Sequence, residues 1–343
     1  MSKKIITVGI VGVSGYSGGL ILELLLNHPL VRVMYVCANN TKGKISDIWP
    51  QLKGRTNLVC GEFNLEKALE LCEVVFLAVP HTTSMQVTPK LLKAKKRVVD
   101  LSADYRLNKA QDYPKWYSVE HTDSKNLSKA VYGLPELYRE DIKKASLVAN
   151  PGCYPTAAIL ALAPVVSSQS KSIHSLTIDA KSGVTGAGKK LTASMMFSEV
   201  HENFKAYKVL KHQHTPEIDQ CLTKLSDHEI KVTFVAHLLP INRGILETIY
   251  VQLNGKLNET DIFNIYRKFY KTEPFVRVLE PGVQPEIRNV IGTNYCDIGL
   301  VLSEDKKTLV ITSVVDNLMK GAASQAIQNM NLMCSFNENE GLK

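Results

Sequence analysis

The spacing of apolar residues over the first 150 positions alternates between two kinds of stretch. Short runs rich in β-branched residues, too continuous to leave one face polar, predict strands buried on both sides. These runs cover residues 5–11, 31–37, 74–79 and 97–101. Helix-like stretches lie between them, at 19–27 and 83–95. Strand and helix in repetition predict a parallel, doubly wound α/β sheet.

After residue 150 the pattern changes. An apolar helix is predicted from Thr156 to about Val166. Apolar and polar residues then alternate with period two at 175–180, 232–239 and 247–253. These stretches predict one mixed or antiparallel sheet, and hence an α+β domain. The stretch from Leu318 to about Cys334 is predicted to be helical. We therefore expect one domain from residues 1–148 with 318–343, and a second from 149–317.

Composition and charge narrow the function. Of 343 residues, 45% are hydrophobic and 22% are charged, as in an ordinary soluble globular protein. The net charge is +8, but the lysines are dispersed and no nucleic-acid motif occurs, so we expect anionic small molecules and not nucleic acid as partners. No apolar stretch is long enough to span a bilayer, and no secretory leader follows Met1. The seven cysteines include no CxxC pair, which argues against a disulfide framework and a zinc site. We expect a cytoplasmic protein.

A glycine-rich loop follows the first predicted strand. Its residues, which we predict to bind a cofactor, are Gly12, Ser14, Gly15, Tyr16, Ser17 and Gly18. Glycines at a strand-to-helix turn let the backbone approach a pyrophosphate, and the helix N-terminus offers N–H groups and a positive dipole. The spacing is GxxGxxG and not the commoner GxGxxG, so the position of the loop carries the argument. It predicts a Rossmann-like dinucleotide-binding domain.

The end of the second predicted strand indicates which dinucleotide binds. NAD-selective sites usually have an Asp or Glu there, which binds the ribose hydroxyls. This chain has Asn39 instead, followed by Lys42 and Lys44. With no carboxylate to repel a 2′-phosphate and lysines to attract it, we predict NADP(H). The alternative is that these lysines only face solvent.

Cys153 has the setting of a nucleophile. An apolar strand ends at Asn150, a Pro-Gly turn follows, and a helix is predicted to start near Pro155. The N–H groups and dipole of a helix N-terminus stabilise a thiolate. No other cysteine of the sequence has this setting, although a buried structural cysteine is the alternative interpretation.

His212 and His214 are candidates for the proton transfer that such a thiolate needs. In an extended segment, residues two apart share a face, so the two rings would lie together. Imidazole titrates near neutral pH and suits general acid–base catalysis, and Glu217 is placed to orient one ring. A metal is the alternative, but no third ligand of matching character is near, so we predict no metal.

Several longer segments, spread almost from end to end, match one known family. They are Gly12-Val-Ser-Gly-Tyr-Ser-Gly18, Val99-Asp-Leu-Ser-Ala-Asp-Tyr-Arg106, Ala130-Val-Tyr-Gly-Leu-Pro-Glu-Leu-Tyr138, Asn150-Pro-Gly-Cys-Tyr-Pro155, Asp179-Ala-Lys-Ser-Gly183 with Gly186-Ala-Gly188, Phe197-Ser-Glu-Val200, His212-Gln-His-Thr-Pro-Glu-Ile218, Asn294-Tyr-Cys-Asp-Ile-Gly299 and Asp316-Asn-Leu-Met-Lys-Gly-Ala-Ala323. On these motifs the chain resembles the N-acetyl-γ-glutamyl-phosphate reductase family. That family uses NADPH in arginine biosynthesis and belongs with the wider aspartate-semialdehyde dehydrogenase group.

The resemblance implies roles for individual residues. Cys153 matches the nucleophile that forms a thioester as phosphate leaves, before reduction to the semialdehyde. Arg106 falls in the segment expected to contact the acyl phosphate, Arg243 is a candidate for the substrate carboxylate, and Asn317 matches the residue that holds the nicotinamide carboxamide. Other residues of the matching segments are expected to contact the substrate, namely Asn150, Ser182 and Gly183. Residues 149–317 would then be the catalytic and oligomerisation domain of a homodimer or homotetramer.

Two positions depart from the family pattern, and other substrates stay open. Asn39-Asn40 replaces a frequent Ser-Arg, so the 2′-phosphate contact would be weaker or would rely on Lys42. Gln213 replaces the Arg between the two histidines. The rival substrates are β-aspartyl phosphate and an N-blocked aminoadipyl phosphate. The second is the harder to distinguish because one methylene is worth only about 1–3 kcal/mol in a pocket. A redox sensor would need a resolving cysteine, and the sequence places none near Cys153.

Overall fold

The computed structural model describes residues 4–342. Residues 1–3 and 343, which belong to the predicted domain ranges and to the argument about a leader, lie outside the described residues. The chain forms two compact units. The first runs up to Pro151 and resumes at Ala322, and the second spans Gly152–Gly321.

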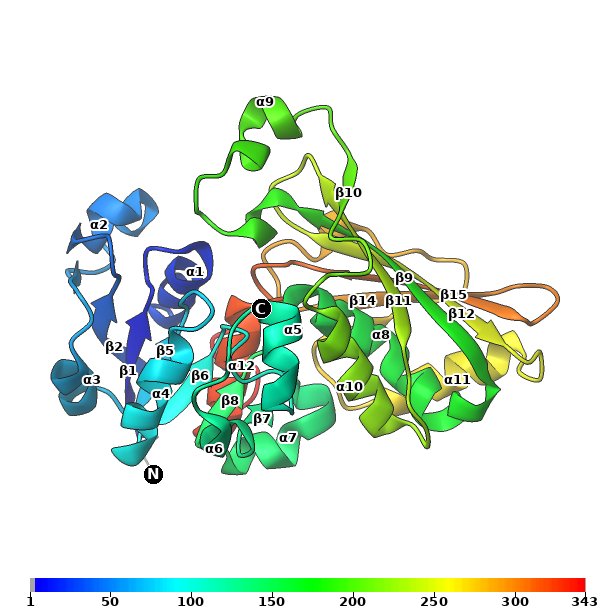
Figure 1. Ribbon diagram of the computed structural model, residues 1–343, viewed down its shortest axis with the longest axis horizontal. Coiled ribbons are helices and arrows are strands. Elements are labelled where there is room, and N and C mark those ends of the chain that lie inside the picture. Colours follow the sequence, from blue (N-terminus) through cyan, green and yellow to red (C-terminus); the bar gives the residue numbers. More distant parts are fainter. Residues whose placement is uncertain (1–3, 343) are drawn as a thin grey trace. The chain divides into compact units, whose positions relative to one another are not determined.

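The first unit is built on a six-stranded parallel sheet with the order β2-β1-β5-β6-β8-β7 (Figure 1). Its strands are β1 (Ile6–Val11), β2 (Val31–Cys37), β5 (Val74–Leu77), β6 (Arg97–Asp100), β7 (Val131–Tyr132) and β8 (Leu147–Ala149). All four residues of β5 are buried, as expected of a strand covered on both faces. The predicted doubly wound α/β architecture is confirmed.

Helices and one small hairpin complete this unit. They are α1 (Tyr16–Leu25), α2 (Ile45–Ile48), α3 (Leu65–Leu71), α4 (Ser84–Lys93), α5 (Tyr113–Tyr117), α6 (Ser124–Leu127), α7 (Pro135–Lys144), α12 (Ala323–Met333), and the paired strands β3 (Gly43–Lys44) and β4 (Val59–Cys60). Helix α12 packs against α1, α7 and β6, and every one of its residues is buried. Because Gln325 and Asn329 are buried with it, their amides need partners, and both donate hydrogen bonds to the Gly133 carbonyl.

The second unit is a seven-stranded mixed sheet with the order β10-β11-β9-β12-β15-β14-β13 (Figure 1). Its strands are β9 (Ile173–Gly183), β10 (Lys205–Tyr207), β11 (Val232–Leu239), β12 (Ile245–Leu253), β13 (Val276–Val278), β14 (Cys296–Leu302) and β15 (Thr308–Val315). The pairs β9–β11 and β13–β14 are parallel and the others antiparallel, which confirms the predicted mixed sheet. Alternate residues of β11 and β12 are buried, so one face of the sheet carries the core.

Helix α8 (Cys153–Gln169) fills that core. It packs against β12, β15 and the helices α10 (Thr215–Leu225) and α11 (Glu259–Phe269), which lie on the same face of the sheet (Figure 1). Pro164 lies inside α8 and has no N–H to donate to the carbonyl of Leu160. Tyr270 donates its hydroxyl to that carbonyl, and Tyr266 donates to the carbonyl of Ala161. The buried helix therefore tolerates an internal proline because the Tyr270 hydroxyl replaces the missing N–H donor to Leu160.

Three predicted helices have ends that differ from the sequence prediction. The helix expected at 19–27 spans Tyr16–Leu25, and the helix expected from Thr156 to about Val166 begins at Cys153 and ends at Gln169. The helix expected from Leu318 begins only at Ala323. The reason for this last error is Asp316, whose carboxylate accepts hydrogen bonds from the backbone N–H groups of Leu318 and Met319 and so holds the chain in a turn.

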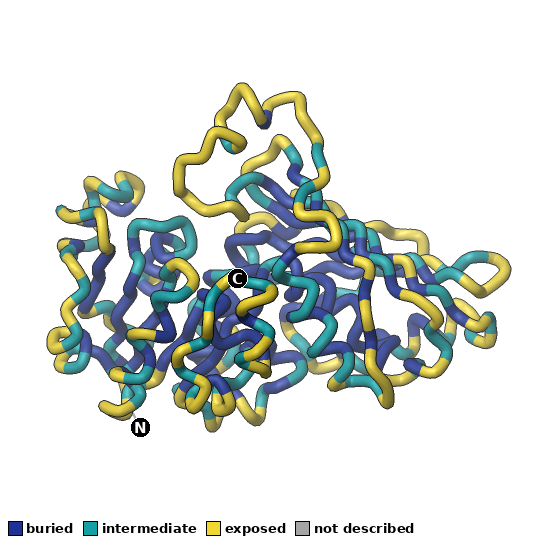
Figure 2. The backbone as a smooth tube through the Cα atoms, viewed as in Figure 1, coloured by how far each residue is buried: buried dark blue, intermediate teal, exposed yellow. Residues whose placement is uncertain are grey.

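A long arm leaves the sheet of the second unit between β9 and β11. It covers residues 184–210 and includes the short helix α9 (Phe197–Val200) and strand β10, which pairs with β11. Figure 2 shows that much of the arm is exposed. Large apolar side chains are part of this exposed surface, namely Leu191, Met196, Phe197, Phe204, Val209 and Leu210.

Candidate active site

The glycine loop between β1 and α1 is shaped by close backbone packing. Gly12 has φ +93°, and a Cβ on it would lie 2.1 Å from the carbonyl oxygen of Ala78. A Cβ on Gly18 would lie 2.2 Å from the Gly12 oxygen. Both positions therefore require glycine. Gly15 instead caps α1 in an extended conformation, and a Cβ on it would make only an ordinary contact of 3.6 Å with the Gly12 oxygen.

Helix α1 begins at Tyr16, so the loop presents the first N–H groups of a ten-residue helix. The predicted cofactor residues from Ser14 to Ser17 are half-buried at this end. The backbone N–H groups of Gly12 and Val13 both donate to the carbonyl of Cys37, which joins the loop to the end of β2. The arrangement fits a pyrophosphate at the helix N-terminus.

A carboxylate from another segment, which the sequence did not predict, lies beside the end of β2. Asn39 and Lys42 follow β2 on the surface, as expected, and Lys42 Nζ lies 2.6 Å from Glu62 Oε1. Glu62 comes from the segment after β4, which the pairing of Gly61 with Cys37 places beside the end of β2. No local sequence signal indicates this, because residues 37 and 61 meet only through the folded sheet.

Cys153 is the first residue of α8 in the second unit. Its sulfur forms no disulfide and is partly exposed, and Gly152 precedes it as an extended cap. A Cβ on Gly321 would lie 2.8 Å from the Cys153 Cβ, so the backbone at 321 approaches the cysteine closely. In contrast, burial raises the pKa of Cys37 to about 11 and that of Cys72 to about 12. Cys153 thus lies at the positive end of a helix dipole and is accessible to solvent. Cys37 and Cys72 are buried and stay protonated, so they are not reactive.

The histidine segment is a turn and not the extended segment in which we expected the two rings to share a face. Thr215 and Pro216 start α10, and the chain turns into this helix so that Thr215 N–H donates to the His212 carbonyl. The two rings nevertheless lie together, with centroids 4.8 Å apart. The His214 N–H donates to His212 Nδ1 at 3.2 Å, so the turn, and not strand alternation, pairs them.

The two histidines have different surroundings. His212 is only 3% exposed and is enclosed by the rings of Tyr154, Tyr207 and Phe234. Burial lowers its pKa to about 4, and Lys208 adds to the effect. A Cβ on Gly152 would lie 2.5 Å from His214 Nε2, so the edge of that ring touches the turn before Cys153.

Glu217 and two tyrosines complete the surroundings of Cys153. Glu217 is fully buried on α10, and its Oε1 accepts a hydrogen bond of 2.7 Å from Gly152 N–H. The contact holds the turn before the nucleophile, while an orienting role toward a histidine stays a prediction. The hydroxyls of Tyr154 and Tyr207 lie 3.2 Å apart, and Tyr154 also donates to the carbonyl of His237. Tyr154 lies in a motif that we quoted, but no sequence signal indicated Tyr207.

A second group of predicted residues surrounds Asp316. This carboxylate is fully buried and lies 2.8 Å from the Arg243 guanidinium. The Asn317 side chain accepts from Gly244 N–H at 2.7 Å and donates to Thr185 Oγ1 at 3.0 Å. Arg243 and Asn317 are therefore held in place by contacts within this unit.

Ser182 and Gly183 end strand β9. Ser182 is 2% exposed and donates to the Gly183 carbonyl, and Gly183 N–H donates to Gly244. A Cβ on Gly183 would lie 2.8 Å from the Arg243 backbone nitrogen. These two residues thus fix the loop that carries Arg243.

Arg106 and Asn150 belong to the first unit. Arg106 donates to the carbonyls of Asn150 and Leu101, at 2.8 and 2.7 Å. Asn150 donates to the carbonyl of Ala322 and accepts from Asn329. The structure shows both side chains fastening the segment that leads from β8 toward Cys153, and their predicted substrate contacts stay predictions.

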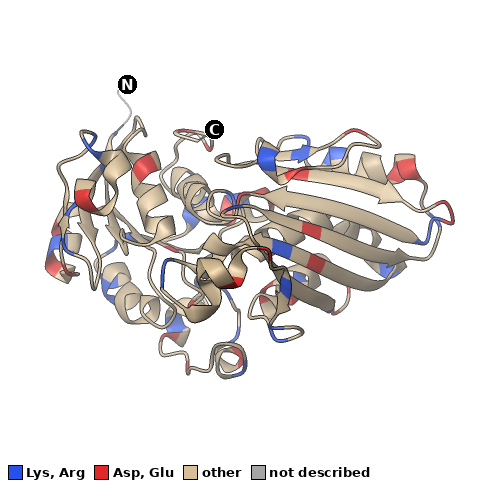
Figure 3. Ribbon diagram, turned by 90° about the horizontal axis from the view of Figure 1, so that it is seen from above, with Lys and Arg blue, Asp and Glu red and all other residues tan. Residues whose placement is uncertain are grey.

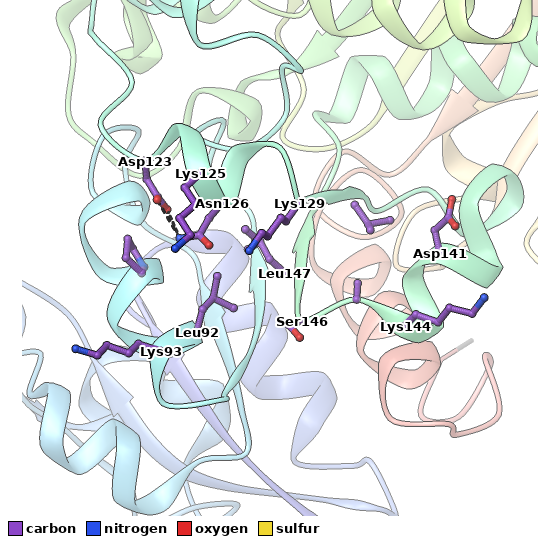
Figure 4. A pocket seen from close by; sticks show the side chains of 13 residues that line it. Leu92, Lys93, Asp123, Lys125, Asn126, Lys129, Asp141, Lys144, Ser146 and Leu147 are labelled. Carbon is purple, nitrogen blue, oxygen red and sulfur yellow. Dashed lines mark hydrogen bonds between the residues drawn. The ribbon is translucent and has the colours of Figure 1, made fainter.

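A cavity of about 940 Å³ in the first unit involves other residues (Figure 4). It is lined by Val131 and Leu147 at the starts of β7 and β8, and by lysines that include Lys93 and Lys129. The glycine loop follows the opposite, carboxyl end of β1. The cavity and the glycine loop therefore lie at opposite ends of the parallel strands, so this cavity is not the dinucleotide site.

Among residues 4–342, no three His, Cys, Asp or Glu side chains gather closely enough to hold a metal ion. In the same part of the chain, no helix has the length and apolar character needed to cross a membrane.

Comparison with known proteins relates both units to one family. Residues 7–145 match the family model "Semialdehyde dehydrogenase, NAD binding domain", and residues 153–317 match "Semialdehyde dehydrogenase, dimerisation domain". Among solved structures, aspartate semialdehyde dehydrogenase II of Vibrio cholerae, complexed with ASA, has a TM-score of 0.72 at 16% identity and covers 97% of this chain and 99% of its own. Aspartate semialdehyde dehydrogenase of Candida albicans, with NADP, has a TM-score of 0.72 at 16% identity, over 96% and 98%. At this identity the likeness shows the fold.

Curated relatives are more similar. The N-acetyl-gamma-glutamyl-phosphate reductase of Desulfotalea psychrophila is 48% identical over 98% of both chains. The reductase of the same name from Pelotomaculum thermopropionicum is 45% identical over 98% of this chain and 97% of its own. The resemblance drawn from the motifs is confirmed, and the chain belongs to the N-acetyl-γ-glutamyl-phosphate reductase family.

Proposed function

We propose that this protein reduces N-acetyl-γ-glutamyl phosphate to N-acetylglutamate 5-semialdehyde and phosphate with NADPH, in arginine biosynthesis, through a thioester on Cys153. The observation that carries the proposal is the place of Cys153. It is the accessible first residue of a buried helix, and the ring edge of His214 lies against the residue before it. The names of the full-length relatives support the substrate.

The residues of the second unit perform the covalent steps. The Cys153 thiolate attacks the acyl carbon, its sulfur–carbon bond forms, and the carbon–oxygen bond to phosphate breaks. Phosphate leaves with the bonding pair, and the acyl group remains as a thioester. NADPH, when bound, would supply the hydride that reduces this thioester to the aldehyde level. Addition of hydride leaves an oxyanion, which accepts a proton to give a thiohemiacetal on Cys153. Loss of that proton then accompanies expulsion of the Cys153 thiolate and releases the semialdehyde.

We assign the proton transfer to His214 and a positioning role to His212. A buried imidazole with a pKa near 4 stays neutral at pH 7, so His212 is a poor acid. Its Nδ1 accepts the His214 backbone N–H, which fixes the turn that carries His214. The Nε2 edge of His214 faces Gly152, next to the nucleophile. Glu217 holds that same turn through the Gly152 N–H.

The remaining predicted residues keep their roles in this proposal. Arg106 binds the acyl phosphate and Arg243 the substrate carboxylate, both as cations that are held by backbone or carboxylate partners. Asn317, held by the Gly244 N–H, is preorganised to bind the carboxamide of NADP(H). The glycine loop of the first unit fits the pyrophosphate of the same cofactor. Asn150, Ser182 and Gly183 position the segments around the substrate. The domains of residues 1–148 with 318–343 and of 149–317 thus divide cofactor binding from catalysis.

The test is a panel of aldehydes in the phosphate-dependent, oxidising direction with NADP. N-acetylglutamate semialdehyde should give the highest kcat/KM, ahead of aspartate and N-acetylaminoadipate semialdehydes. Cys153→Ser should abolish turnover while NADPH binding persists. Preference for either other aldehyde would overturn the substrate, and substantial turnover by Cys153→Ser would overturn the thioester.

We also propose that the protein is a homo-oligomer, a dimer or tetramer, of the cytoplasm. The dimerisation-domain match supports this, as do the exposed apolar side chains of the arm, since soluble proteins rarely expose such groups together. Most residues along the strands of the seven-stranded sheet are uncharged (Figure 3), and Tyr250 and Val301 are exposed on these strands. None of the seven cysteines forms a disulfide, which suits a reducing compartment. Light scattering should give a mass of two or four chains; a monomer at micromolar concentration would refute the assembly.

A further inference from the structure

A lysine and a carboxylate, Lys42 and Glu62, lie beside the end of β2, whereas the sequence predicted only the lysine there. Enzymes that select NAD usually place an acidic residue at this strand end to accept hydrogen bonds from the ribose hydroxyls. Asn39 occupies that place in the sequence. The carboxylate of Glu62 reaches the same strand end from a different segment of the first unit.

Several backbone contacts fix the position of Glu62. Ala38 N–H donates to the Gly61 carbonyl at 3.0 Å, and Tyr35 donates its hydroxyl to the carbonyl of Glu62. The next residue but one is held as well, because Asn64 N–H donates to the same Tyr35 hydroxyl at 2.7 Å. Although the Glu62 side chain is exposed, its backbone is thus tied to β2 on both sides.

The same strand end is tied to the glycine loop. Cys37, the last residue of β2, accepts from Gly12 and Val13 on one side and pairs with Gly61 on the other. A dinucleotide whose pyrophosphate lies at the N-terminus of α1 places its adenosine ribose at the end of β2. The Lys42–Glu62 pair, with 2.6 Å between Nζ and Oε1, lies at that place.

We propose that Glu62 sets the choice between NADPH and NADH, acting as the ribose-facing carboxylate that the β2 sequence lacks, with Lys42 as its counter-charge. This inference rests on the proposed use of NADP(H). A 2′-phosphate attracts the Lys42 ammonium but is repelled by the Glu62 carboxylate. The free ribose hydroxyls of NADH would instead donate to that carboxylate. Glu62 therefore lowers the preference for NADPH that Lys42 alone would give.

The experiment measures the ratio of kcat/KM for NADPH to kcat/KM for NADH in the intact protein. Glu62→Gln removes the charge and keeps the size, so the ratio should rise about three- to tenfold, through KM and not kcat, as expected for one charge facing a phosphate in a largely aqueous setting. Lys42→Gln should lower the ratio by a similar factor. Raising the ionic strength should shrink both effects because exposed charges are screened.

A matched control is Glu70→Gln, which makes the same charge change on the exposed surface of α3 in the same unit. Its ratio should stay within twofold of the wild-type ratio. Titration of NADP⁺ and NAD⁺ binding to the same variants gives the corresponding ratio of Kd without turnover. If the proposed reaction is wrong, the turnover measurements fail, whereas the ratio of Kd values still reports on Glu62. A Kd ratio that Glu62→Gln leaves within twofold of the wild-type ratio, or that Glu70→Gln raises as much, would overturn the role of Glu62.

Discussion

Replacement of Gly152 by alanine tests the arrangement of the nucleophile and His214 most directly. Gly152 has φ −67° and ψ 154°, an extended backbone conformation that alanine adopts without strain. The added Cβ would lie 2.5 Å from His214 Nε2 and 2.9 Å from both Cδ2 and Cε1. An ordinary contact at this site begins at 3.4 Å. The His214 ring must therefore move by about 1 Å, with the backbone of the turn unchanged.

A displacement of this size can be converted to a rate. Misplacing a catalytic group by 1 Å costs on the order of 100-fold in rate. This corresponds to about 2.7 kcal/mol of transition-state stabilisation. We expect kcat of Gly152→Ala to fall by about that factor, while the hydrogen bond from residue 152 N–H to Glu217 persists. Steady-state kinetics measures the rate, and thermal unfolding checks that the fold survives.

The control is the same change in a protein that lacks the imidazole. If Gly152→Ala acts through the ring, it should cost little further activity in a His214→Ala background, because the two changes remove the same interaction. Additive losses in the double variant, or an unchanged kcat in Gly152→Ala, would refute the inferred geometry.

Three further changes test other parts of the structure. Both carboxylate oxygens of Glu247 are buried with no hydrogen-bond partner among residues 4–342, and burial raises the pKa of this carboxyl well above the usual value near 4.5. The stability that its protonated form contributes is therefore present below about pH 4.5 and is lost as pH rises through the folded pKa. Glu247→Leu should raise Tm more at pH 8 than at pH 5, and an equal shift at both would contradict this. Gly18→Ala should weaken NADPH binding at least tenfold in a fluorescence titration, because its Cβ would lie 2.2 Å from the Gly12 oxygen. Asp316→Ala should destabilise the protein by about 3–5 kcal/mol in urea unfolding, because it leaves Arg243 without its carboxylate, whereas a loss under 1 kcal/mol would show that the pair matters little.

The sequence was sufficient for those elements whose signal is local. The strand Val31–Cys37 was predicted to the residue, and β5 and β6 were placed within two residues of their ends, because a continuous apolar run and its breaking residues are properties of neighbours in the chain. The setting of Cys153 was likewise readable, since strand, Pro-Gly turn and helix follow directly on one another. The helix simply starts earlier than Pro155, at the cysteine itself.

What the sequence did not reveal depends on contacts between distant residues. The pairing of Gly61 with Cys37 brings Glu62 to the end of β2, and no pattern near either residue announces it. Tyr207 reaches Tyr154 only because β10 pairs with β11. The histidine turn was mistaken for an extended segment because alternation of two residues is too short to fix a conformation. Tertiary structure decides all three.

The place of α12 in the chain has a consequence for biosynthesis. The first unit needs this buried helix, whose amides bind Gly133 and Asn150, yet the helix is encoded after the whole of the second unit. At about 5–20 residues per second, a ribosome needs on the order of 10–30 s to make the intervening chain. During that time the six-stranded sheet lacks one of its packing partners, while the second unit is already complete. The catalytic unit can therefore mature first on the nascent chain, and the dinucleotide-binding unit closes only when the last helix emerges.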